Sequence, residues 1–399
     1  MVKSDGEWNM ERKSKKRGTV KQWNAEHRNR KWKDTNRKDV KPKEVPPKKA
    51  NKKNVNRKNV KWNASLKDRA GKMKKADITV VIPNYQGVRY LEACLKSLYN
   101  GSLIPEIIVI DNGSTDGSAQ LAVKLAAQKA PAFRLVRFSE NKGFCAAVNA
   151  GIRLAKTEYV MLLNNDTEVD EDCVRNLYRA IVKRKRAFSV SAKMLSMRQP
   201  EIIDDAGDLY CSLGWAFAPG KGKPRRNYQK EARIFAACGG AAVYRKSVFE
   251  TIGYFDENHF AYLEDIDVGY RARLSGYENY YAPDALVYHA GSAVSGSRYN
   301  EFKVRLTSRN SIYLIYKNMP FAQILLNLPH LAAGFGIKAL FFAGKGMGRA
   351  YMEGLAEGIR LSLSKEGKKQ KVPFRSECLG HYIRVQAELW WNTVRRITG

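Results

Sequence analysis

Oxygen-bearing side chains follow several short apolar segments of this sequence. Side chains of this kind bind hard dications and hydrogen-bond the polar groups of nucleotides. The residues after the apolar segments are therefore the first candidates for chemistry. The clearest sets are Pro83-Asn84-Tyr85 after residues 78–82, Asp111-Asn112-Gly113-Ser114 after residues 106–110, and Asn164-Asn165-Asp166 after residues 159–163.

A second group of candidates lies about a hundred residues further on. The run Glu264-Asp265-Ile266-Asp267 offers carboxylates that can accept a proton from a hydroxyl group. If Asp265 opens a helix, Asp267 and Arg271 are four residues apart and can form an ion pair, which leaves Asp265 on another face. His289 follows the apolar run 285–288 and is either a metal ligand or a structural histidine.

Strands and helices must alternate to position these residues. Apolar runs that are too short for helices are each followed by a polar turn and a helical pattern, which predicts parallel βαβ units and an α/β fold. The predicted strands are 78–82, 106–110, 133–138 and 159–163, and the predicted helices are 88–99, 118–128, 144–154 and 170–182. The ligand crevice of such a sheet lies beyond the carboxyl ends of its strands, where the candidate residues stand.

Several motifs in a fixed order carry a family resemblance. The sequence resembles the inverting family 2 glycosyltransferases of the GT-A fold, in the branch with bacterial rhamnosyltransferases, over about residues 77–318. The motifs are V-V-I-P-N-Y, I-V-I-D-N-G-S-T-D-G-S, N-K-G-F-C-A-A-V-N-A-G-I, L-L-N-N-D-T and F-A-Y-L-E-D-I-D-V-G-Y-R-A-R. The resemblance implies transfer of a hexose or deoxyhexose from a dTDP-, UDP- or GDP-linked donor, with Mg²⁺ or Mn²⁺.

The same resemblance implies roles for single residues. Asp111 would accept the imide N–H of the base, Asp265 with Glu264 would supply the catalytic base, and Asp166 with His289 would hold the metal. The other residues expected at the donor are Pro83, Tyr85, Lys142, Gly143, Asn149, Asn164, Asn165 and Arg309.

Structural alternatives stay open for many of these residues. Asp111 can simply be part of a turn. The asparagine-rich loop at residues 164–166 can cap the helix that follows it, and Glu264 and Asp265 can cap the helix that they open. Lys142 can be a solvated lysine, and Arg309 can belong to a solvated basic helix face.

Positive charge is concentrated in the first 75 residues. They hold 27 Lys and Arg against 8 Asp and Glu, which is +19 of the total net charge of +32. With almost no branched aliphatic residues, this tail is expected to be disordered. Its Trp-containing basic stretches suit an anionic membrane surface, and nucleic acid or another polyanion stays open as a partner.

The C-terminal region carries a membrane signal. Residues 318–337 contain no formal charge, but Pro320 and Pro329 argue against a lone span. We expect a broken amphipathic pair in the interface, followed by a basic helix around 338–365 and the pair Trp390-Trp391. An ordinary helical subdomain is the alternative.

These observations predict a tail at 1–75, a GT-A catalytic domain at 76–310 and a helical region at 311–399. Scattered cysteines and the lack of an early apolar segment favour a cytoplasmic enzyme, peripheral at the inner face of the cell membrane. Its acceptor would be a glycan or a polyprenyl-linked saccharide in cell-surface polysaccharide or cell wall synthesis. The rival functions are a sugar nucleotidylyltransferase and a nucleic-acid or polyanion-binding protein that uses the tail.

Overall fold

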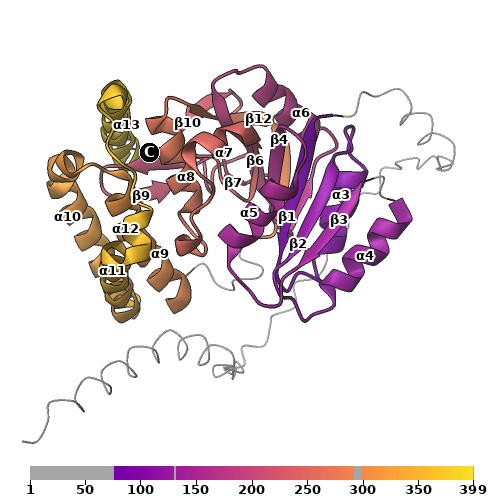
Figure 1. The fold of residues 1–399 in the computed structure, drawn as a ribbon, viewed down its shortest axis with the longest axis horizontal. Coiled ribbons are helices and arrows are strands. Elements are labelled where there is room, and N and C mark those ends of the chain that lie inside the picture. The colour runs from indigo at the N-terminus through magenta and orange to yellow at the C-terminus, as the bar shows by residue number, and fades with distance from the viewer. Residues whose placement is uncertain (1–75, 130–131, 292–298, 399) are drawn as a thin grey trace, which may run out of the picture. The chain divides into compact units, whose positions relative to one another are not determined.

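A mixed ten-stranded sheet runs through the computed structural model (Figure 1). The structure describes residues 76–129, 132–291 and 299–398. The expected disordered tail lies outside these residues. The strand order is β10-β12-β6-β11-β4-β1-β2-β3, with β5 paired to β12 and β7 paired to β6.

The predicted βα units form the parallel part of this sheet. Strand β1 pairs in parallel with β2 and β4, and β2 pairs in parallel with β3. All four predicted strands are confirmed within two residues. They are β1 Ile78–Asn84, β2 Glu106–Asp111, β3 Phe133–Arg137 and β4 Tyr159–Leu163.

The rest of the sheet is mixed. Strand β11 lies antiparallel between β4 and β6, and β12 then pairs in parallel with β6. A separate hairpin pairs β8 with β9. The remaining strands are β5 Thr167–Val169, β6 Ala187–Ser196, β7 Ile203–Asp205, β8 Leu209–Cys211, β9 Trp215–Phe217, β10 Ala232–Ile234, β11 Ala241–Arg245 and β12 Glu278–His289.

Helices cover both faces of the sheet because successive strand side chains point to opposite faces. In β1, Val80 and Ile82 pack with helices α3, α4 and α6, whereas Val81 packs with α5, α7 and α8. These helices, with one short 3₁₀ turn, are α3 Leu91–Tyr99, α4 Ser118–Lys129, α5 Phe144–Leu154, α6 Cys173–Val182, α7 Lys246–Ile252, η1 Glu257–His259 and α8 Glu264–Leu274.

The C-terminal helices gather at one end of the sheet (Figure 1). Residues of α8, α9, α10 and α13 share one apolar core with the β8–β9 hairpin. The elements of this region are α9 Glu301–Asn318, α10 Phe321–Gly344, α11 Gly348–Leu363, α12 Lys365–Lys369, η2 Ser376–Cys378 and α13 Leu379–Thr398.

The expected broken pair after residue 318 is wrong. Helix α10 continues for 24 residues with Pro329 inside it, so the loss of one backbone donor does not end the helix. The expected helix at 338–365 is also divided differently. Gly346 has φ +71° and separates α10 from α11, a conformation that glycine adopts without strain.

Candidate active site

Asn84, at the end of β1, links the ends of three strands. Its Nδ2 lies 3.1 Å from Asp111 Oδ1, and its Oδ1 accepts a hydrogen bond from Asn165 Nδ2 at 2.8 Å. A Cβ atom on Gly87 would lie 2.2 Å from both amide side chains. Residue 87 must therefore be glycine for the loop to pack against this amide network.

Asp111 lies at the predicted strand end, but its carboxylate is covered. The residue has no exposed surface, and its Oδ2 accepts a hydrogen bond from Arg137 Nε at 3.3 Å. The Arg137 side chain is about half exposed. The Asp111 carboxylate is thus paired with a cation that solvent reaches.

Asn112 joins the two loops expected at the nucleotide. Its Nδ2 donates to Gly143 O at 3.1 Å, and its Oδ1 accepts from the Lys142 backbone at 2.9 Å. Gly143 has φ +89°, and a Cβ there would lie 2.6 Å from Phe260. The glycine is needed both for its backbone conformation and for this close approach.

The expected metal ligands lie side by side. His289 Nε2 is 3.4 Å from Asp166 Oδ1, and His289 Nδ1 is 2.7 Å from Asp204 Oδ2. A histidine whose second nitrogen is held by a carboxylate is the usual arrangement around a protein-bound metal. Asp204 is not among the residues predicted from the sequence.

The two carboxylates also change the charge of His289. Burial lowers its pKa, but the hydrogen bonds that the imidazole donates to Asp166 and Asp204 outweigh this effect and raise the pKa to about 9. Asp204 has its own pKa lowered: burial opposes this, but His289 and Lys221 outweigh it. Without a cation bound, His289 therefore carries a proton at neutral pH.

Asp265 has a carboxyl partner at the start of α8. Burial raises the pKa of both Asp265 and Asp208, and a hydrogen bond between them raises that of Asp208 further while lowering that of Asp265. Asp208 therefore holds its proton more tightly than this hydrogen bond lets Asp265 hold one, and its carboxyl group can donate a hydrogen bond to the Asp265 carboxylate. A raised pKa suits a general base, because proton acceptance improves as the pKa approaches the working pH.

The segment before Asp265 has an unusual backbone. Phe260, Tyr262 and Leu263 all have positive φ values between 62° and 70°. Asn310 on α9 stabilises this segment, because its Nδ2 contacts the carbonyl oxygens of residues 259, 261 and 262 at 2.8–3.0 Å. Strained backbone held by its surroundings is typical of functional sites.

Asp267 has the structural role predicted for it. Arg271 Nη2 lies 2.8 Å from Asp267 Oδ2, and Lys317 Nζ lies 2.9 Å from the same atom. Both partners and the favourable charges overcome burial and hold the Asp267 pKa well below its usual range. The predicted pair with Arg271 is confirmed.

Asn149 and Arg309, which were expected at the nucleotide-sugar donor, form hydrogen bonds within the protein. Asn149 uses its amide to hold the backbone at Phe255 and the side chain of Glu257. Arg309 is mostly buried and donates to the carbonyl oxygens of Asn258 and His259. Both side chains position residues 255–259, and contact of either one with the nucleotide stays a prediction.

The other expected residues have free polar or accessible groups. Asn164 is half-buried, and its Nδ2 would be 3.2 Å from a Cβ on Gly240. Tyr85 and Lys142 are exposed and Pro83 is half-buried. Glu264 is buried with Oε2 unpaired among the described residues.

Three aspartates of residues 204–208 were missed by the sequence argument. Asp204 and Asp208 contact His289 and Asp265, while Asp205, Asp208 and Cys238 place ligand atoms within 4.8 Å of one another. The available signal was three carboxylates in five residues beside a glycine. Residues 204–208 lie outside the sequence motifs that carry the family resemblance, so they were not predicted as site residues.

Comparisons with known proteins agree on the class of this chain. The profile described as "Glycosyl transferase family 2" matches residues 79–253. The N-acetylglucosaminyl-diphospho-decaprenol L-rhamnosyltransferase of Mycobacterium tuberculosis is 29% identical over 237 residues, 53% of this chain and 75% of that protein. The poly-beta-1,6-N-acetyl-D-glucosamine synthase of Staphylococcus epidermidis is 29% identical over 182 residues, 45% of this chain and 42% of the synthase.

Among solved structures, the mannosyltransferase PcManGT from Pyrobaculum calidifontis, in complex with GDP-Man and Mn²⁺, aligns with a TM-score of 0.46 and 19% identity. The alignment covers 80% of this chain and 88% of the mannosyltransferase. The profile match includes the strand ends that carry Asn84, Asp111 and Asp166. The chain contains a glycosyltransferase family 2 domain, matched over residues 79–253.

Proposed function

We propose that this chain is a metal-dependent, inverting glycosyltransferase that moves a hexose or deoxyhexose from a nucleotide-diphospho-sugar to a saccharide or lipid-linked acceptor. The observation that carries the proposal is the pairing of Asp166 with His289 at 3.4 Å, backed by Asp204. The rhamnosyltransferase relative supports a lipid-linked acceptor and a role in cell-surface polysaccharide or cell wall synthesis.

The donor nucleotide would bind at the ends of β1 and β2. Asp111 accepts the imide N–H of the base after Arg137 turns aside, and Asn112 keeps Lys142 and Gly143 beside it. Pro83, Tyr85, Asn164 and Asn165 complete this side of the site. A carboxylate at this position is compatible with dTDP, UDP or GDP.

The candidate metal ligands fit a hard dication such as Mg²⁺ or Mn²⁺. Asp166 supplies an oxygen, His289 supplies a nitrogen, and Asp204 orients the imidazole ring through Nδ1. When bound, the cation would neutralise charge that develops on the diphosphate leaving group.

Asp265 would act as the base for the acceptor hydroxyl. Its carboxylate takes the hydroxyl proton while the acceptor oxygen attacks the anomeric carbon on the side opposite the diphosphate. The new glycosidic bond forms as the bond to the diphosphate breaks, which inverts the configuration. Protonated Asp208 orients Asp265, and Glu264 adds a second carboxyl group beside it.

Helix α10 supports a membrane location for this reaction. It is long and apolar enough to cross a membrane, with a mean hydropathy of 1.4 over 18 residues, yet only 17% of that window is buried. Its buried stripe is partly polar, since Gln323 and Asn327 both hydrogen-bond Gln386. Its apolar side chains face outwards, with Phe321 72% and Leu340 77% exposed.

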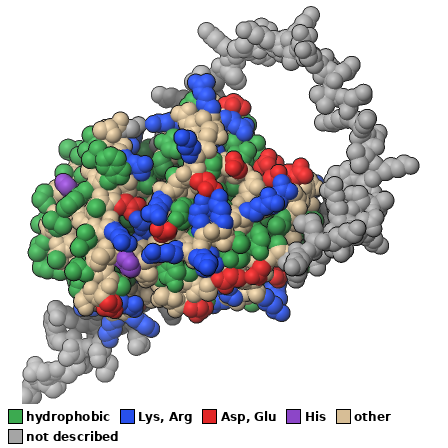
Figure 2. Space-filling model, turned by 90° about the horizontal axis from the view of Figure 1, so that it is seen from above, with side chains coloured by type: hydrophobic (Ala, Val, Ile, Leu, Met, Phe, Trp, Pro, Cys, Tyr) green, Lys and Arg blue, Asp and Glu red, His purple; other side chains and the backbone are tan. Residues whose placement is uncertain are grey.

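A surface helix of a water-soluble protein turns its apolar side chains towards the core and its polar side chains towards water, and α10 does the reverse. Helices α11 and α13 continue the outward apolar surface, and Trp391 is 60% exposed on α13. Figure 2 shows hydrophobic side chains gathering at the end of the molecule where α10 and α13 lie. We define the exposed apolar side chains of α10, α11 and α13 as the apolar face.

The occupant of the apolar face in this proposal is an anionic lipid bilayer. Lys345, Arg349, Lys365 and Arg384 are exposed on the same helices or the turns between them. Exposed apolar groups with cations and interfacial tryptophans match helices that lie in the membrane surface. The enzyme would then be peripheral at the inner face of the cell membrane, where it meets a polyprenyl-linked acceptor.

Calorimetry tests the donor site directly. Wild-type protein is titrated with UDP, GDP and dTDP in the presence of Mn²⁺, Mg²⁺ or a chelator. One nucleotide should bind with a dication and lose affinity with the chelator, and Asp166→Ala should abolish the dependence on metal while the fold stays intact. Equal affinity in the variant, with unchanged transfer activity, contradicts the proposed site.

A further inference from the structure

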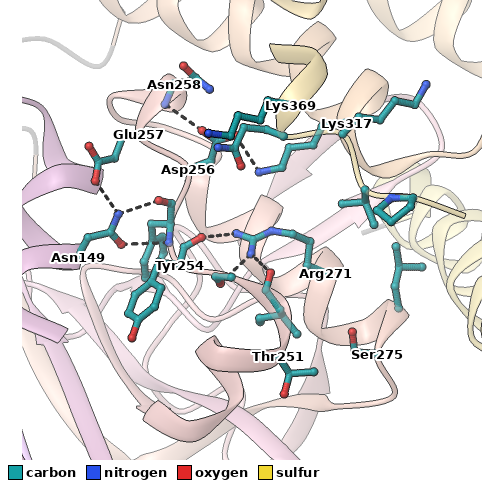
Figure 3. Close-up of a pocket in the computed structure, with 18 of the residues that line it drawn as sticks. Asn149, Thr251, Tyr254, Asp256, Glu257, Asn258, Arg271, Ser275, Lys317 and Lys369 are labelled. Atoms are coloured by element: carbon teal, nitrogen blue, oxygen red, sulfur yellow. Dashed lines mark hydrogen bonds and ion pairs between the residues drawn. The ribbon is translucent and has the colours of Figure 1, made fainter. Parts of the chain in front are cut away.

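A cavity of about 610 Å³ has none of the proposed catalytic carboxylates or metal ligands among its lining residues (Figure 3). It is formed by residues 251–258, the C-terminal half of α8, Lys317 on α9 and residues from 366 to 382. Of the residues expected in the active site, Asn149 alone lines it. Nothing in the proposed transfer reaction uses this cavity.

The floor of the cavity is a closed network of charges. Lys317 Nζ lies 2.8 Å from Asp256 Oδ2 and 2.9 Å from Asp267 Oδ2. Arg271 is paired with Asp267 and also donates to the carbonyl oxygens of residues 252–254. These buried cations already have partners, so they make a firm base and leave little charge for a ligand.

The positive charges that a ligand can contact lie at the rim of the cavity. Arg153, Lys369, Lys371 and Arg375 are exposed, and in the part of the chain that the structure describes they form no ion pair. Aromatic rings position two of them: Arg153 lies 4.5 Å from the Tyr254 ring centre and Lys371 lies 4.5 Å from that of Tyr316.

Acidic residues at the rim do not balance these cations. Glu257 Oε1 accepts a hydrogen bond from Asn149 at 3.1 Å, and Glu366 is exposed at the start of α12. Four cations thus face two carboxylates around a hollow that is partly closed by Tyr254, Pro373 and Tyr382. Cations without acidic partners, with the hydroxyl groups of Thr251 and Ser275 in the same lining, suit a phosphate group better than an apolar or a cationic ligand.

We infer that this cavity binds a phosphate-bearing ligand at a site separate from the donor. The phosphate can belong to a lipid headgroup or to a soluble phosphorylated molecule. A lipid can reach it, because the chain that lines the cavity at Val372, Pro373 and Arg375 also exposes Phe374 and, at the start of α13, Leu379.

Calorimetry of the full chain with pyrophosphate, in EDTA and at physiological salt, tests this inference. Pyrophosphate should still bind without a dication, and Lys369→Gln combined with Arg375→Gln should weaken binding at least tenfold. The matched control is Lys365→Gln with Lys368→Gln, which removes the same charge from exposed positions outside the cavity. An equal loss in both double variants means that pyrophosphate follows net charge, and the inference is then wrong.

Two further experiments distinguish this site from the donor site and show whether the phosphate belongs to a lipid or to a soluble molecule. Asp166→Ala should keep EDTA-resistant pyrophosphate binding, even if it loses all metal-dependent nucleotide binding. Vesicles with phosphatidic acid should bind better than phosphatidylglycerol vesicles of matched charge if a lipid phosphomonoester is the ligand, and this preference should vanish in K369Q/R375Q alone. If only pyrophosphate distinguishes the double variants, the ligand is soluble. If neither probe does, the cavity is not a phosphate site.

Discussion

The α/β part of the chain and its C-terminal helices distribute polar and apolar side chains in different ways. In β1, apolar side chains enter the cores on both faces of the sheet, and polar groups stand at the strand end. In α10, Gln323 and Asn327 point inwards and Leu340 points outwards. The first arrangement suits water outside the protein, and the second suits a lipid surface.

The distribution of exposed apolar side chains sharpens this contrast. Among described residues, seventeen of the large exposed hydrophobic side chains lie after residue 320 and seven lie before it. Scattered exposed hydrophobic residues are normal, but a contiguous group marks an interaction surface. In the proposed function, the α/β part carries the chemistry and the helical part locates the enzyme at the membrane.

The largest expected effect is on the chemistry. Asp265→Asn keeps the size of the side chain but removes proton acceptance, so turnover should fall about 10² to 10⁴-fold while donor binding is preserved. Steady-state kinetics and nucleotide calorimetry measure the two quantities separately.

Asp267→Asn is the matched control two residues away. It leaves Arg271 and Lys317 without their shared carboxylate, so the free energy of unfolding should fall by about 3–5 kcal/mol. If instead Asp267→Asn folds normally and loses more turnover than Asp265→Asn, the base has been assigned to the wrong carboxylate.

A smaller effect is expected behind the metal site. Asp204→Asn keeps a partner for His289 Nδ1 but removes its charge, and loss of such an outer partner weakens metal binding about 10 to 100-fold. Titration of Mn²⁺ followed by electron paramagnetic resonance measures this affinity. Asp172→Asn is the control, because Asp172 is a half-buried carboxylate at the start of α6 that pairs with Arg175. Equal affinity in all three proteins would show that Asp204 does not support a metal.

The apolar face gives the next effect. Leu340→Gln should reduce partition to anionic vesicles about tenfold, because a buried leucine side chain contributes about 1.5–3 kcal/mol. This loss should persist at high salt, whereas binding by the basic tail should be screened. Val123→Gln on α4 is the control, since Val123 is 54% exposed in the α/β part. Equal partition of both variants would falsify the lipid assignment.

Another effect concerns stability against pH. Burial, then the charge of Asp265, raise the Glu264 pKa from 4.5 to about 8. The folded state therefore holds this proton more tightly, and its contribution to stability is complete below pH 4.5 and lost as the pH rises through about 8. Urea unfolding from pH 4.5 to 8 should show a shallower decline for Glu264→Gln. An unchanged slope would show that Glu264 ionises freely.

The sequence predicted the elements with strong local patterns. Strands β1 to β4 and helix α5 follow directly from apolar runs and turns, and their order brought Asp111, Asn165 and Asp166 to one edge. Asp267 was assigned to Arg271 from helical spacing alone, and this pair is present.

Long-range contacts decided what the sequence did not predict. Asp204 meets His289 because β7, which carries Asp204, pairs with β6, and β6 lies beside β12, which carries His289. Asn149 and Arg309 were assigned by their position along the chain, but tertiary packing uses both to hold residues 255–259. Pro329 suggested a helix break, yet contacts on both sides of it keep α10 continuous.

The stereochemistry of transfer tests the central claim most directly. Purified protein is incubated with the donor identified by calorimetry and a lipid-linked acceptor in vesicles, and proton NMR gives the anomeric configuration of the first product. We predict a configuration opposite to that of the donor, formed only with a dication and lost in Asp265→Asn. A product that retains the donor's configuration, or that forms equally well in EDTA, contradicts a single metal-assisted displacement with Asp265 as base.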